Sequence, residues 1–184
     1  MAPKLKVTKE DIVNAAFNLI RENGSTALNA RTIAAALGCS TQPIFSNFAS
    51  MEELRKAVEE KSAALYEKYM AKEEENSPRY KAGGMAYIRF AKEEKELFKL
   101  FFMCDRKGEP IPENDPLGNE MTGLVHTNLG LSREEAKLFH MEMWIYVHGI
   151  ATMLATGFLD ISWELIDRML TDAYQGLRKQ YGLE

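Results

Sequence analysis

The stretch LNARTIAAALGCSTQPIFSNFASMEELRKAV, residues 28–58, contains two short helical patterns joined by a turn. Asn29 can cap the first helix, because its side chain can accept the backbone N–H groups left open at a helix start, and Gly38 can close that helix. Ser40 can cap the second helix, over residues 41–47. Two short helices joined by a tight turn with a glycine predict a helix-turn-helix.

Pro43 fits this pattern, although a proline inside a helix normally breaks it. With Ser40 as the cap, Pro43 is the third helical residue, and the backbone N–H groups of the first turn have no intrahelical acceptor to lose. The apolar residues expected to hold the two helices together are Ile33, Ala34, Leu37, Ile44 and Phe48.

Helices are also predicted on either side of this stretch. Thr8 and Asp11 form a capping-box pattern that opens a helix ending at Asn23-Gly24. Ser50 and Glu53 form a second capping-box pattern, which opens a longer helix with apolar residues at helical spacing.

The remainder of the chain shows helical patterns and no persuasive strand pattern or internal repeat. These patterns cover residues 85–103, 116–129, 132–157 and 161–181, after a polar run at 72–84 and around a proline-rich loop at 105–116. We predict an all-α protein with a three-helix helix-turn-helix domain at 1–50 and a larger helical domain at 51–184.

The composition indicates a globular cytoplasmic protein. The chain has 184 residues and a net charge of -4, divided into +2 for residues 1–50 and -6 for the remainder. The longest stretch without charged residues is 17 residues, 143–159, which is shorter than a membrane span needs. Cys39 and Cys104 lie far apart without a CxxC partner, as expected for reduced thiols.

The second helix of the helix-turn-helix carries side chains suited to reading bases. The candidates facing the DNA groove are Thr41, Gln42, Pro43, Ser46 and Asn47. Gln and Asn can each form a bidentate pair with adenine, and Thr can contact thymine, with about 1–3 kcal/mol of discrimination for a good bidentate pair. The alternative is a polar, solvated face in an ordinary three-helix unit.

These residues carry a resemblance to a known family. Residues 8–58 resemble, without a gap, the amino-terminal DNA-binding domain of the TetR family of transcriptional regulators. WIYVHGIATMLATG, residues 144–157, and EKELFKLFFM, residues 94–103, resemble one branch of that family, whose ligand-binding domain has a Trp and His-Gly motif.

The resemblance implies roles for individual residues. Asn29 and Arg31 would approach the phosphate backbone, residues 41–43 would read bases, and Lys4, Lys6 and Lys9 would form a basic arm. The full set of expected DNA-binding residues is Lys6, Asn29, Arg31, Ser40, Thr41, Gln42, Pro43, Phe45, Ser46, Asn47 and Met51.

Two positions depart from the family pattern. Phe45 stands where the family usually has a tyrosine whose hydroxyl touches a phosphate, and Met51 stands where a lysine commonly does so. Because phosphate contacts dominate affinity and its salt dependence, we expect a shallower salt dependence than in a relative with both groups.

The carboxyl-terminal half is rich in Met and aromatic residues, which indicates either plain core or a cavity for an apolar or aromatic ligand. The expected pocket residues are Phe98, Phe102, Met121, His140, Trp144 and His148. The last three recur every four residues on one helix face, so the alternative is that the histidines are buried and bonded to neighbouring helices. A metal site is disfavoured, because eight helical residues separate the two histidines by about 12 Å.

We therefore expect a homodimeric transcriptional regulator, in which the last two long helices of each subunit pair. Family resemblance implies a repressor, released from a near-palindromic DNA operator by a small apolar or aromatic effector. The alternative function is a helical protein-binding adaptor without DNA-binding activity. Without a nucleophile-base pair, phosphate loop or metal-binding spacing, the sequence favours neither an enzyme nor a cofactor.

Overall fold

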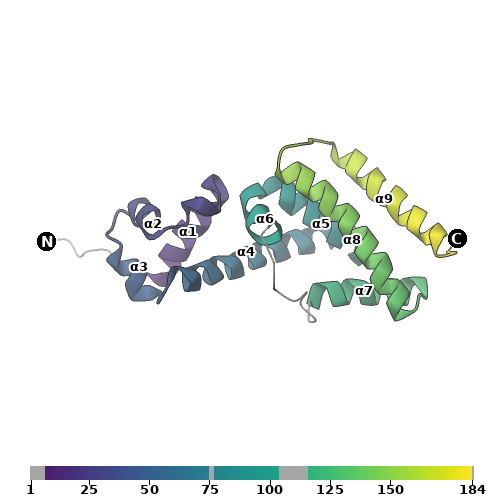
Figure 1. The fold of residues 1–184 in the computed structure, drawn as a ribbon, viewed down its shortest axis with the longest axis horizontal. Helices are drawn as coiled ribbons and strands as arrows, with labels where there is room; N and C mark the ends of the chain where they lie inside the picture. Colours follow the sequence, from purple (N-terminus) through teal and green to yellow (C-terminus); the bar gives the residue numbers. More distant parts are fainter. Residues whose placement is uncertain (1–6, 75–76, 104–115, 184) are drawn as a thin grey trace. The chain divides into compact units, whose positions relative to one another are not determined.

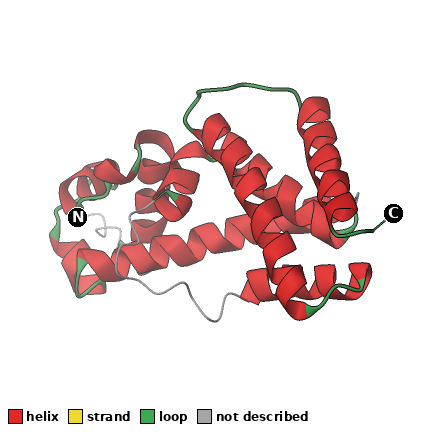
Figure 2. Cartoon of the chain, turned by 45° about the vertical axis from the view of Figure 1, so that its right-hand side comes forward, coloured by secondary structure: helices red, strands yellow, loops and turns green. Residues whose placement is uncertain are grey.

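The computed structural model describes residues 7–74, 77–103 and 116–183, and all regular secondary structure in these ranges is helical (Figures 1 and 2). The all-α prediction is confirmed. The elements are α1 (Lys9–Asn23), the short 3₁₀ turn η1 (Ser25–Ala27), α2 (Ala30–Ala36), α3 (Gln42–Asn47), α4 (Met51–Glu74), α5 (Arg79–Glu93), α6 (Lys95–Phe102), α7 (Pro116–Leu129), α8 (Arg133–Ala155) and α9 (Trp163–Gln180). No helix in these ranges is both long and apolar enough to cross a membrane.

The chain divides into two compact units. The amino-terminal unit consists of Met1–Glu67 and Glu94–Cys104, and the carboxyl-terminal unit consists of Lys68–Glu93 and Asp105–Glu184. Helix α6 therefore belongs to the same unit as the helix-turn-helix, and α4 contributes to both units. Cys104 and the predicted loop at 105–116 lie, apart from the start of α7, outside the described residues.

The amino-terminal unit is built around apolar residues from four helices. Its fully buried side chains include Ile12 and Ile20 of α1, Ile33 of α2, Ile44 of α3 and Leu54 and Val58 of α4. Of the predicted anchors, Ile33, Ala34, Ile44 and Phe48 are buried and Leu37 is half-buried. The pattern that predicted the helix-turn-helix therefore describes its packing correctly.

The predicted ends of α1 are confirmed. The Thr8 hydroxyl accepts a hydrogen bond from the Asp11 backbone N–H at 3.1 Å, and the Asp11 carboxylate accepts one from the Thr8 N–H at 2.9 Å. At the other end, Gly24 adopts φ 80°, a value that side-chain-bearing residues rarely tolerate. Both ends of α1 could be predicted from residues that lie close together in the sequence.

The start of α3 differs from the prediction by one residue. Thr41, not Ser40, occupies the cap position, and no side chain caps this helix. The reason is that the Thr41 carbonyl is the first acceptor of the helix, since it receives the N–H groups of Ile44 at 3.1 Å and Phe45 at 3.4 Å. Pro43 is consequently the second helical residue, still within the first turn, where its missing N–H has no cost.

The helix predicted over residues 85–103 is two helices, α5 and α6, separated at Glu94. The backbone of Glu94 leaves the helical region, with φ -120° and ψ 52°, and the residue is 3% exposed. Its carboxylate accepts two hydrogen bonds from the guanidinium of Arg21 on α1. A local helical pattern does not reveal a partner 73 positions away in the sequence.

Helix α5 begins earlier than predicted and includes part of the polar run at 72–84. Gly83 and Gly84 lie inside this helix, although glycine lowers helix propensity. A Cβ atom on Gly83 would lie 3.3 Å from the Met121 sulfur of α7, and one on Gly84 would lie 3.4 Å from a Val147 methyl of α8. The two glycines thus allow α7 and α8 to approach α5 closely.

The carboxyl-terminal unit packs α5, α7, α8 and α9 around a second core. Its fully buried side chains include Ile88 and Phe90 of α5, Phe139 of α8 and Ile166 of α9. The predicted helices at 116–129, 132–157 and 161–181 correspond to α7, α8 and α9, with ends that differ by at most two residues.

Candidate nucleic-acid interface

Helix α3 presents one face to the core and the other to solvent. Ile44 is fully buried and Phe48, the residue that follows the helix, is 2% exposed. Gln42, Phe45 and Ser46 are exposed on the other side. Helix α3 is therefore held firmly by its apolar side while its outer surface is open to a partner.

Two of the predicted base-reading side chains are hydrogen-bonded to their own helix. The Ser46 hydroxyl donates to the Gln42 carbonyl at 2.9 Å, and the Asn47 amide donates to the Pro43 carbonyl at 2.7 Å. These bonds occupy the Ser46 hydroxyl proton and one of the two N–H donors of the Asn47 amide, which could otherwise meet base edges. The sequence did not reveal them, although Ser and Asn often bond locally to the backbone.

Gln42 is the polar side chain best placed to read a base. It is exposed at the first position of α3, and within the described ranges its amide makes no hydrogen bond. Thr41 and Pro43, on either side of it, are half-buried. Ser40 is exposed in the turn before α3. It does not have the capping role that the sequence predicted for it.

The start of α2 carries the two residues expected near phosphates. The Asn29 side-chain oxygen accepts the backbone N–H groups of Arg31 at 3.1 Å and Thr32 at 3.0 Å, which confirms the predicted cap. Only the carbonyl oxygen of the amide is used by the cap, so its two N–H donors can point outward. Arg31 is exposed beside it.

We expect the two roles of Asn29 to be separable by mutation. Asn29→Ala removes the cap and should lower the free energy of unfolding by about 1 kcal/mol, measured by urea denaturation. Asn29→Asp keeps the cap, because a carboxylate accepts the same N–H groups, but it places a negative charge toward phosphate. Its stability should match the wild type while its DNA binding at low salt is weaker. Equal DNA binding by the Asn29→Asp variant and the wild type would contradict the phosphate role.

The basic arm is described only at Lys9, because Lys4 and Lys6 lie outside the described residues. The Lys9 ammonium donates to the Glu53 carboxylate at 3.1 Å and lies 4.7 Å from the centre of the Phe48 ring. A hydrogen bond from the Ala49 backbone, together with Lys9, lowers the pKa of Glu53 below its ordinary value. Lys9 thus joins the starts of α1 and α4, and its charge is partly offset.

Phe45 and Met51, the two positions that depart from the family pattern, differ in exposure. The Phe45 residue is 56% exposed, an unusually open position for a phenylalanine. Met51 is half-buried at the first position of α4. Neither side chain carries a hydrogen-bond donor, so neither replaces the phosphate contact that the family pattern implies.

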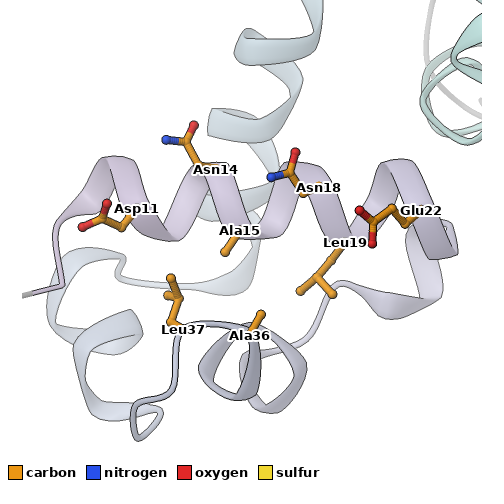
Figure 3. A pocket seen from close by; sticks show the side chains of 8 residues that line it. All are labelled: Asp11, Asn14, Ala15, Asn18, Leu19, Glu22, Ala36 and Leu37. Carbon is orange, nitrogen blue, oxygen red and sulfur yellow. The ribbon is translucent and has the colours of Figure 1, made fainter.

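A shallow hollow of about 390 Å³ lies between α1 and α2 (Figure 3). Figure 3 shows Ala15 and Leu19 of α1 pointing toward Ala36 of α2 and Leu37, the residue that follows α2. The polar residues that line the hollow all lie on α1. Those polar residues are Asp11, Asn14, Asn18 and Glu22. The two carboxylates would repel phosphate, so we assign the hollow no part in the DNA surface.

The first two of the predicted pocket residues, Phe98 and Phe102, lie in the amino-terminal unit. Their ring centres are 5.1 Å apart, and Phe102 also contacts Tyr66 of α4 edge-on at 6.3 Å. Phe98 is fully buried. These two residues pack with each other, whereas the other four predicted pocket residues belong to the carboxyl-terminal unit.

The two histidines of α8 are bonded to tyrosines of α5, as the alternative interpretation of the sequence expected, although both are half-buried and not fully buried. His140 Nδ1 is hydrogen-bonded to the Tyr80 hydroxyl at 3.2 Å, and His148 Nδ1 to the Tyr87 hydroxyl at 2.9 Å. Partial burial lowers the pKa of His148 below its ordinary value, which favours the neutral imidazole. Whether these residues also contact an effector stays a prediction.

Trp144 and Met121 lie in different surroundings within the carboxyl-terminal unit. The Trp144 indole stacks on the His148 ring, with centres 5.2 Å apart, and the residue is 44% exposed. Met121 is 5% exposed and packs beside Gly83. Of the four predicted pocket residues in this unit, Met121 is buried, His140 and His148 are half-buried, and Trp144 is exposed.

The outer face of α8 is apolar and exposed. Leu138 is 55% exposed, Met141 46% and Ile145 58%. These positions, three and four residues apart, lie on one side of the helix, opposite the buried Phe139, Met143 and Val147. Exposed apolar side chains gathered on one helix face mark an interaction surface.

Comparisons with known proteins agree with this geometry. A family model described as "Bacterial regulatory proteins, tetR family" matches residues 12–58, which include the helix-turn-helix. A second model, described as "Tetracyclin repressor-like, C-terminal domain", matches residues 80–173, more than half of the chain. A search of curated proteins found no match.

Proposed function

Because the chain belongs to the TetR family and is a DNA-binding transcriptional regulator, not an enzyme, we propose that it acts as a homodimeric repressor. In this proposal, two copies of α3 bind a near-palindromic operator in the cytoplasm, and a small apolar or aromatic effector releases them. The DNA-binding module would end at residue 50, and residues 51–184 would bind the effector and the second subunit.

The observation that carries the DNA-binding part is the two-sided construction of α3. Its inner face is fixed by Ile44 and Phe48, and its outer face offers Gln42, while Asn29 and Arg31 are exposed at the start of α2. In helix-turn-helix proteins the second helix enters the major groove and the contacts to phosphate fix its register. This arrangement supports base reading by α3 and phosphate binding at the start of α2.

The exposed face of α8 supports a dimer. A single helix-turn-helix reads few base pairs, and dimers place two recognition helices about 34–36 Å apart on successive major grooves. Leu138, Met141 and Ile145 form an apolar row that a second copy of α8 could cover, with Leu165 of α9 also exposed at 44%. We propose that α8 and α9 form the interface between subunits.

The Trp144 and His148 pair supports the placement of an effector site in the carboxyl-terminal unit. A partly exposed indole stacked on a neutral imidazole offers both an aromatic surface and a polar atom to a small ligand. An effector would release DNA if it binds more tightly to the state in which the two α3 helices are out of register with the grooves.

The proposal is tested by selecting binding sites from a random duplex library with the purified full-length chain at low salt. We expect enriched sequences to contain an inverted repeat, and we expect a gel shift with the DNA upstream of the chain's own gene. Failure to enrich or shift any DNA at low salt would argue against the proposed function and favour a protein-binding adaptor.

Restoring the two missing phosphate contacts should strengthen DNA binding. We expect Met51→Lys to steepen the plot of log affinity against log salt by about 0.9 per subunit, because each new cation releases one condensed counterion. Phe45→Tyr should raise affinity for all sequences without changing this slope, because its hydroxyl is neutral. Fluorescence anisotropy at several salt concentrations measures both. No gain by the double variant at any salt concentration would contradict this assignment.

A further inference from the structure

The exposure of Phe45 on α3 is unusual for a phenylalanine. It is 56% exposed, although the adjacent Ile44 is fully buried and Phe48, one turn later, is 2% exposed. An aromatic ring left in water forgoes the stabilisation that burial would give it. A position on the outer face of α3 suggests that this ring is covered only when DNA is bound.

The helix geometry places Phe45 in the same surface as Gln42. Each residue turns an α-helix by about 100°, so Phe45 lies about 60° from Gln42, on the side opposite Pro43. Ser46, the other exposed residue of this surface, has its hydroxyl bonded to the Gln42 carbonyl. The outer face of α3 therefore offers one polar reader, Gln42, flanked by apolar surface from Phe45 and Pro43.

The major groove presents few apolar groups that such a surface could recognise. Base edges there carry hydrogen-bond donors and acceptors, and thymine adds a C5-methyl group. Contact between an apolar side chain such as Phe and this methyl is a known form of direct base readout. A phenyl ring cannot donate a hydrogen bond to phosphate, so the backbone oxygens offer it no comparable partner.

We propose that Phe45 is a specificity-determining residue that recognises a thymine in each half-site by packing against its C5-methyl group. This inference rests on the proposed function, because it requires α3 to lie in the major groove. It assigns to the Phe45 ring a sequence-reading role, whereas the phosphate contact that the family pattern implies for this position would require the hydroxyl that Phe45→Tyr restores.

The test replaces each thymine of the selected operator, one at a time, with deoxyuridine, which lacks only the methyl group. Affinities of the wild type, Phe45→Ala and the control Asn119→Ala are measured by fluorescence anisotropy. Wild type should lose about fourfold in affinity at one thymine per half-site, the factor expected for burying one methyl group, and about fifteenfold when both half-sites are changed. Asn119→Ala should show the same losses, because Asn119 is exposed near the start of α7 in the carboxyl-terminal unit, outside the DNA-binding residues.

Phe45→Ala should bind the original operator more weakly but lose nothing further on deoxyuridine substitution at that position. Its melting temperature should match the wild type, since the side chain is exposed. Equal deoxyuridine losses in wild type and Phe45→Ala at every thymine would overturn the inference while leaving the proposed function intact. Failure of wild type to select any operator would overturn both.

Discussion

An Ile145→Asp substitution is expected to convert the proposed dimer into monomers and to weaken operator binding by about a hundredfold or more. Ile145 is 58% exposed, near the middle of α8 and at one end of its apolar row. A carboxylate there would lose its water on association without gaining a partner, which opposes pairing of two α8 helices. Linked half-site contacts commonly gain a factor of about 10²–10⁴ over single ones, and a monomer loses that gain.

Sedimentation velocity measures the mass of the variant, and anisotropy measures its operator affinity. Asn119→Asp is a matched control, because it adds the same charge at an exposed position near the start of α7, away from the proposed interface. The control should remain a dimer. If Ile145→Asp also remains a dimer, the α8 face is not the interface between subunits.

The second large effect is expected for Arg21→Met, which removes the guanidinium bonded to the buried Glu94. The Glu94 side chain is 2% exposed, whereas that of Arg21 is 50% exposed. Removing one partner of a buried ion pair takes away the hydrogen bonds and attraction that stabilise the other charge, which typically costs about 3–5 kcal/mol. We expect a loss near 3 kcal/mol in the free energy of unfolding, at the lower end because water reaches Arg21.

Adding Glu94→Gln to Arg21→Met should recover part of that loss, because it removes the charge that was left behind. Arg168→Met is the matched control: its partner is Asp172, and both side chains are more than two-thirds exposed, so it should cost at most about 1 kcal/mol. Urea denaturation measures all four proteins. Equal small losses for Arg21→Met and Arg168→Met would contradict a structural role for the α1–α6 ion pair.

The sequence predicted those parts of the fold that depend on neighbouring residues. The cap by Asn29, the capping box of Thr8 and Asp11 and the helix end at Gly24 each involve residues at most four positions apart. Apolar spacing likewise identified Ile44 and Phe48 as the inner face of α3. The family resemblance, carried by these local features, led to the correct class of protein.

Some features that the sequence did not reveal depend on residues distant in the chain. Others depend on which of several possible acceptors a side-chain donor takes. The break between α5 and α6 coincides with the bond between Glu94 and Arg21, 73 positions apart. The two glycines inside α5 are explained by side chains of α7 and α8, which pack too close to leave room for larger residues. Ser46 bonds to its own helix, although its hydroxyl could equally have faced outward.

The sequence predicted which residues form the candidate site better than it predicted how their side chains are bonded. Gln42, which the helix-turn-helix pattern predicted, and Arg31, which the family resemblance implied, are both exposed. The internal bonds of Ser46 and Asn47, however, leave fewer polar readers than the residue types suggested. Recognition by apolar contact, centred on Phe45, follows from that difference.

The most direct test of the central claim, that two copies of α3 read two half-sites together, is to change the spacing between half-sites of the selected operator. Insertion of about 5 base pairs, half a turn of DNA, places the second half-site on the opposite face of the duplex. The account predicts a loss of about a hundredfold or more in affinity. Unchanged affinity after this insertion would show that the half-sites are not read by one symmetric dimer.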